Sequence, residues 1–218
     1  TSDSASGAPG NLTVNAGTLT ITNEAVISAG SPQSIGPAGE VTVTADSVII
    51  TADGQILSRS FARNSGQVTI TANELTMDDG SIATSTSSPT GGRGGDVVVN
   101  SGTVSLTNGA SINSQSEPFS SGSAGDVTMN VGTLSLANGS QISSASIGTP
   151  VTNPDDGTTQ ASGTAGNVVI TAAGSFTSDG STVATSAEAN HGGDVSITAH
   201  SVQLSNGTVI TANSNAPL

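Results

Sequence analysis

Apolar and polar residues alternate in short segments along most of the chain. The stretch Gly95–Ser114, which reads GDVVVNSGTVSLTNGASINS, has the clearest pattern. Counting from Gly95, apolar residues stand at positions +2, +4, +9, +11 and +17, with an Asn-Gly pair at +13 and +14. A period of two with many β-branched residues is typical of strands. The pattern therefore predicts three short strands, each with one apolar face, separated by turn residues.

This stretch recurs as GDVTMNVGTLSLANGSQISS at Gly125–Ser144, and weaker copies follow the same phase. One copy could not bury its apolar faces alone, whereas stacked copies could, and repetition at this period is typical of solenoids. We therefore predict an all-β, right-handed parallel β-helix of seven coils of three short strands, spanning residues 10–212. The predicted coil starts are seven glycines: Gly10, Gly39, Gly66, Gly95, Gly125, Gly166 and Gly193.

Antiparallel hairpins are the structural alternative, because Asn-Gly and Asp-Gly pairs fall between the second and third segments of the coils. Hairpins would give no reason for a constant repeat phase, and we favour stacking of each strand on its homologue one coil later. The sixth coil departs from the pattern, since Phe176 lies between two polar residues at the expected inner positions. Either that strand slips by one residue or Phe176 points outward, and the sequence leaves both open.

The remaining segments are predicted to lie outside the coils. Residues 1–9 are interpreted as a tail or the end of a preceding loop, and residues 213–218 as a tail or continuation. Residues 145–165 form a long loop insertion between the fifth and sixth coils. Insertions in solenoids collect on one edge, where they cost little.

Composition narrows the function classes. Aromatic residues are 1% of the chain and Gly numbers 28, a bias that favours disorder, but a disordered chain has no reason to keep a repeat phase. The net charge is -13, and the three basic residues are all arginines. We therefore expect neither nucleic acid nor an anionic membrane as a partner, since both require clustered Lys or Arg. No apolar run approaches the ~20 residues of a membrane span, and the lack of Cys excludes disulfides and Cys-ligated metals.

The repeat pattern G-[ND]-V-x-[VI]-[NT], followed by L-x-L-x-[ND]-G-x-x-I-x-[ST], resembles repeats of filamentous haemagglutinin-like bacterial exoproteins of two-partner secretion systems. The resemblance covers about Gly10 to Ala212, and Gly95–Ser114 and Gly125–Ser144 match best. It implies a right-handed parallel β-helix that is exported and displayed as an adhesive fibre on the bacterial cell surface or outside the cell. The secretion domain that begins such proteins is not recognisable in this sequence.

Candidate chemistry is sparse, and we expect no catalytic residues and no enzyme activity. Acidic residues are mostly spread one per coil, apart from Asp78–Asp79 and Asp155–Asp156, and neighbours on a strand point to opposite faces. His191 and His200 have no evident catalytic partner and are predicted to lie on the surface. Asp96 and Asp126 begin consecutive coils, where Ca²⁺ could relieve their repulsion. Stacked amides and capped turns are the alternative explanation of that column, and we favour them.

The outward side of the first strand is predicted to form a flat face without charge. Threonine dominates this face, with Asn, Val and Ser in the other coils, and such a surface could bind glycan, bind ice or pack on another fibre. The candidate binding residues are Thr13, Thr42, Thr44, Thr69, Thr71, Thr128, Thr171 and Thr198. The favoured function is an extracellular structural or adhesive fibre module, whose partners are further β-helix coils end to end, and glycans or other cell surfaces. An ice- or glycan-binding solenoid is the first alternative and a polysaccharide-degrading β-helix enzyme the second.

Overall fold

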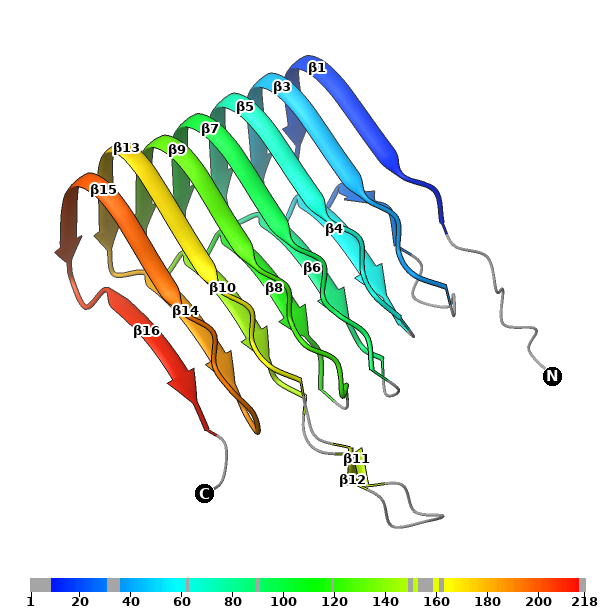
Figure 1. Ribbon diagram of the computed structural model, residues 1–218. Coiled ribbons are helices and arrows are strands. Elements are labelled where there is room, and N and C mark those ends of the chain that lie inside the picture. The colour runs from blue at the N-terminus through cyan, green and yellow to red at the C-terminus, as the bar shows by residue number, and fades with distance from the viewer. Residues whose placement is uncertain are drawn as a thin grey trace.

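The computed structural model describes residues 9–30, 36–61, 63–88, 91–118, 120–148, 151–152, 159–160 and 163–215. Within these ranges the chain is all β, and Figure 1 shows its strands stacked side by side in two layers. Each layer is a parallel sheet of seven strands, so the stack holds seven rungs and about six turns between the first and last. None of the described segments is a helix able to cross a membrane.

The two sheets alternate along the chain, one strand of each per coil. The first sheet contains β1 (Leu12–Ile21), β3 (Val41–Thr51), β5 (Val68–Asp78), β7 (Val97–Thr107), β9 (Val127–Ala137), β13 (Val168–Asp179) and β15 (Val195–Ser205). The second contains β2 (Val26–Ser28), β4 (Gln55–Ser60), β6 (Ser81–Thr86), β8 (Ser111–Ser116), β10 (Gln141–Ser146), β14 (Thr182–Ala187) and β16 (Val209–Ser214). Neighbours within each sheet are homologous strands of successive coils, which confirms the parallel solenoid and excludes the hairpin alternative.

Each coil contains two main strands rather than the three predicted. The first and second predicted segments run on as one strand of 10 to 12 residues, which arches over one side of the stack (Figure 1). The pairing of β3 with β5 continues to Ala45 and Ala72, omits one position and resumes at Ser47 and Glu74. Both segments pair with the same neighbouring coils, so the corner between them interrupts the ladder at a single position.

The apolar columns form one continuous core between the sheets. In the inner coils, the apolar side chains at the predicted inner positions are buried, for example Val97, Val99 and Ile112. The structure also settles the position of Phe176, which is fully buried and pairs with Leu134 and Val202 after a register shift that follows Ala172. The strand therefore slips by one residue, because a bulge costs less than leaving the largest side chain of the coil in water.

The coil-start glycines are required by close contact between coils. A Cβ atom on Gly95 would lie 1.9 Å from the carbonyl oxygen of Gly66, and one on Gly125 would lie 2.3 Å from that of Gly95. Gly39, Gly66, Gly166 and Gly193 meet the preceding coil start in the same way. The backbones of successive coils therefore touch at this corner, where no side chain fits.

The Asn-Gly and Asp-Gly corners differ from each other. Asn108 and Gly109 both adopt positive φ, at 54° and 81°. At the Asp-Gly corner of the second coil, Asp53 has the positive φ of 60°, whereas a Cβ on Gly54 would lie 2.5 Å from the carbonyl oxygen of Ile21. Gly54 therefore serves close approach between coils, and the left-handed position of this turn is occupied by Asp53.

Two predicted boundaries move. β10 continues to Ser146, so the first two residues of the predicted 145–165 insertion pair within the second sheet. β16 continues to Ser214, so the solenoid extends two residues into the predicted 213–218 tail. Both segments are polar, and the backbone ladder holds them without an apolar signal. Within the insertion, β11 (Val151–Thr152) and β12 (Thr159–Gln160) form a short antiparallel pair.

We predict that Val99→Asp destabilises the protein by several kcal/mol, because it places an unpaired carboxylate in a fully buried core position. Thr128→Asp, on the outward side of β9, is expected to change the free energy of unfolding by less than ~1 kcal/mol. Urea denaturation of both variants measures the difference. Equal destabilisation by the two substitutions would contradict the assignment of inner and outer faces.

Candidate functional site: the coil edges and outer faces

The candidate threonines lie on the outer side of the first sheet, in two columns that cross its strands. Thr13, Thr42 and Thr69 pair in succession in one column, to which Thr128 also belongs. The second column contains Thr44, Thr71, Thr171 and Thr198. Asn100 and Asn130 extend the second column, where the Asn130 side-chain amide donates a hydrogen bond of 3.0 Å to Asn100. The face is built as the sequence indicated, and its binding role stays a prediction.

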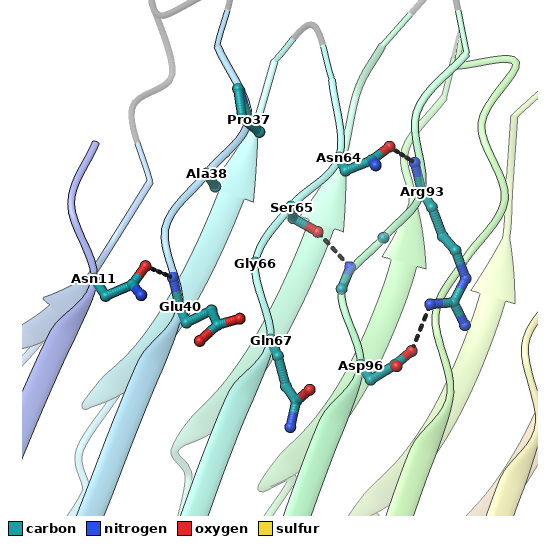
Figure 2. A pocket seen from close by; sticks show the side chains of 12 residues that line it. Asn11, Pro37, Ala38, Glu40, Asn64, Ser65, Gly66, Gln67, Arg93 and Asp96 are labelled. Atoms are coloured by element: carbon teal, nitrogen blue, oxygen red, sulfur yellow. Dashed lines mark hydrogen bonds and ion pairs between the residues drawn. The ribbon is translucent and has the colours of Figure 1, made fainter. Parts of the chain in front are cut away.

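The residues after the coil-start glycines form a ladder between side chains and backbone. The backbone N–H of Glu40 donates to Oδ1 of Asn11 at 2.9 Å, as Figure 2 shows. The same contact links three further pairs of coils: Asp126 N–H to Asp96 Oδ1 at 2.9 Å, Asn167 N–H to Asp126 Oδ1 at 2.7 Å, and Asp194 N–H to Asn167 Oδ1 at 2.9 Å. Asn and Asp suit this position because a short oxygen-bearing side chain reaches the next coil. Such capping is the explanation that we favoured for the column.

Asp96 and Asp126 share a guanidinium group. Arg93 contacts the Asp96 carboxylate at 2.8 Å and the Asp126 carboxylate at 3.3 Å, and all three side chains are partly exposed. The arginine therefore offsets the repulsion for which the sequence suggested Ca²⁺. Among the described residues no three His, Asp or Glu side chains are grouped to hold a metal, and a calcium site stays a prediction. A shallow groove of about 370 Å³ lies beside this edge (Figure 2).

A buried column of hydroxyl groups ties the second sheet to the coil-start glycines. Ser114 donates to the Gly95 carbonyl oxygen at 2.8 Å and accepts from the Gly125 N–H at 2.8 Å. The column consists of Ser58, Thr84, Ser114, Ser144 and Thr185, and the other four members also form hydrogen bonds to the backbone of coil-start glycines. In the sequence these residues are only the last position of the repeat pattern. Their small polar character, two residues after a core isoleucine or valine, was the available signal.

The other candidate groups do not converge on a catalytic arrangement. Asp78 accepts a hydrogen bond of 2.7 Å from the Asn108 side chain, and Asp79 occupies a turn with φ of 55°. His191 and His200 are exposed, as predicted. Asp155–Asp156 lies outside the described residues. Asp78 and Asp79 therefore serve a turn at the edge of the coil.

Comparison of the chain with protein families, with curated proteins and with solved structures returned no match. The resemblance to haemagglutinin-like repeats therefore rests on the repeat pattern alone.

We predict that Ser114→Ala lowers the free energy of unfolding by about 1–3 kcal/mol, because it leaves the Gly125 N–H without its buried acceptor and removes one of the two hydroxyl donors to the Gly95 carbonyl oxygen. Ser116→Ala is the matched control. Ser116 lies on the same strand and is equally buried, yet its hydroxyl has no hydrogen-bond partner among the described residues. Its replacement is expected to be neutral or stabilising. Urea denaturation distinguishes the two variants, and equal losses would show that the Ser114 hydrogen bonds contribute nothing specific.

Proposed function

We propose that the chain is a structural module of an extracellular or cell-surface fibre, extended by further β-solenoid coils at both ends. The observation that carries this proposal is the exposure of the core columns at the last rung. Val202 and Leu204 are 51% and 49% exposed, whereas their counterparts Val104 and Leu106 are 1% and 0% exposed. Ile210, in the core column of the second sheet, is 38% exposed, whereas its counterpart Val183 is fully buried. The end of both sheets therefore presents apolar surface and unpaired backbone groups.

The first rung offers a complementary face. Leu12, Val14 and Ile27 belong to the core columns but are only partly buried, whereas their counterparts in the second coil are fully buried. Gly10 belongs to the glycine column, yet nothing among the described residues lies within 4 Å of a Cβ built on it. At the other coil starts, glycine is required because the preceding coil leaves no room for a Cβ, and the same need arises at Gly10 when another coil stacks on it. At the opposite end, Asp194 is the residue of the last coil that corresponds to Asp96 and Asp126. Each of those two carboxylates accepts a hydrogen bond from a backbone N–H of the following coil.

The role of this stack is structural rather than catalytic in the proposal. Asp78 and Asp96 accept hydrogen bonds at a turn and at a coil edge, and both histidines are exposed. Three arginines, no lysine and 1% aromatic residues give few cleavage sites to common proteases, which suits an exposed fibre. The resemblance to exported repeats supports the location outside the cell. A sustained turnover of neutral or acidic polysaccharides by the protein would overturn this part of the proposal.

The threonine face ranks second as the basis of function. Threonine fills both columns of this face in only two of the described strands, at Thr42/Thr44 and at Thr69/Thr71. The other strands place Asn, Val or Ser in at least one of the two columns. A face with two such rows favours general association or glycan contact over the regular array that ice binding requires.

We predict that the 218-residue protein associates head to tail as its concentration rises, because stacking buries the exposed ends of both sheets. Sedimentation velocity follows the mass, and negative-stain microscopy shows whether the products are rods. Gly10→Ala is expected to keep the fold and to reduce association, since its methyl group would meet the Gly193 end of the next copy.

Val202→Asp tests the opposite face and is expected to reduce association in the same way. Glu74→Gln, at an exposed position of β5 away from both ends of the stack, is the control that should leave association unchanged. A stable monomer at high concentration, with the amides of both end rungs protected from hydrogen exchange, would contradict the proposal.

A further inference from the structure

A second groove lies on the outer side of the second sheet, at the end of its strands. It has a volume of about 410 Å³ and spans three successive rungs. Arg59 and Phe61 come from the end of β4, Ser85 and Ser87 from the end of β6, and Glu117 follows β8. Phe61 is one of three phenylalanines in the chain, and in the sequence Arg59 and Arg63 flank it, which indicates at most an exposed contact patch.

The ladder fixes how these side chains face one another. Arg59 pairs with Ser85, and the Ser87 N–H donates to the Ser60 carbonyl oxygen, so Phe61 and Ser87 occupy equivalent positions. The Glu117 N–H donates to the Thr86 carbonyl oxygen, which places Glu117 next in that column. Because Ser87 is small, the groove has a low middle rung between two taller walls. The walls stand two strand spacings apart, or roughly 10 Å.

The two walls carry different chemistry. One wall presents the Phe61 ring, which is 54% exposed, beside the Arg59 guanidinium. The other presents the Glu117 carboxylate, with Pro118 beside it and the Gln115 amide donating to it at 3.4 Å. Serine hydroxyls lie on the rung between them. An apolar ring with a few convergent polar groups is the usual composition of a small-molecule site.

We propose that this groove binds a hexose unit of a neutral glycan. The C–H face of a pyranose ring stacks on an aromatic ring, while its vicinal hydroxyls accept from a guanidinium and donate to a carboxylate. The opposite charges of Arg59 and Glu117 cancel, so the groove itself favours neither an anionic nor a cationic ligand. The net charge of -13 on the protein disfavours acidic glycans. The groove accommodates a hexose unit within a glycan chain as well as one at the end of the glycan.

The test titrates the full chain with cellohexaose, maltohexaose and a β-1,3-linked glucohexaose. We expect at least one of them to bind with a Kd of about 1 mM or below. Chemical shifts in the NMR spectrum should move at Phe61, Ser87 and Glu117. Phe61→Ala and Glu117→Gln should each weaken binding about tenfold. Both side chains are at least partly exposed, so urea midpoints near that of the wild type are expected and will exclude a loss of fold.

The control is Glu74→Gln, which changes an exposed carboxylate on β5 of the first sheet and should bind normally. The double variant Thr44→Ala and Thr71→Ala tests the threonine face as the alternative site. The proposal is overturned if none of the three oligosaccharides binds at about 10 mM, roughly tenfold above the expected Kd. It is equally overturned if binding survives both groove variants, or is lost in the threonine double variant instead. None of these outcomes depends on end-to-end association, which the mass measurements test separately.

Discussion

The structure depends on one constraint, the direct contact of successive backbones at the coil-start glycines. At this corner the carbonyl oxygen of one coil occupies the space that a Cβ of the next would need, with Gly95 and Gly66 as the tightest pair of coil starts. The contact fixes each coil directly above the last, in register. Once the register is fixed, the apolar columns meet in the core, Ser114 reaches the glycines on both sides of it, and the Asp126 N–H reaches the Asp96 carboxylate.

Stacking in register also explains why the candidate functional surfaces of this protein are columns. Each outward position repeats at every rung, about 4.8 Å apart, so a substitution in one coil changes one step of a row. The threonine face arises where threonine recurs in two neighbouring columns, with Asn, Val or Ser at the remaining positions. The groove at Phe61 arises where the repeat varies, with a small Ser87 between two larger side chains. Stability then approximates a sum over coils and their interfaces, and the exposed end rungs are its weakest parts.

The sequence predicted the rungs, the core columns and the outward threonines, because a strict period of two marks which side chains face inward. It failed at features that the backbone decides. The corner within β7 looked like a break between strands, although the ladder crosses it. Gly54 looked like a turn residue, and Phe176 was ambiguous until the bulge placed it in the core. The groove at Phe61 could not be foreseen, because it requires loop positions of three coils to align. The right-handed sense of the coils stays a prediction.

Equilibrium unfolding of Gly95→Ala beside Gly10→Ala tests the glycine contact most directly. The substitution is identical and both residues belong to one column, but a Cβ on Gly95 lies 1.9 Å from a carbonyl oxygen whereas nothing described lies within 4 Å of one on Gly10. We predict a loss of about 1–3 kcal/mol or more for Gly95→Ala and a change within ~0.5 kcal/mol for Gly10→Ala. Equal stability of the two variants would contradict the account.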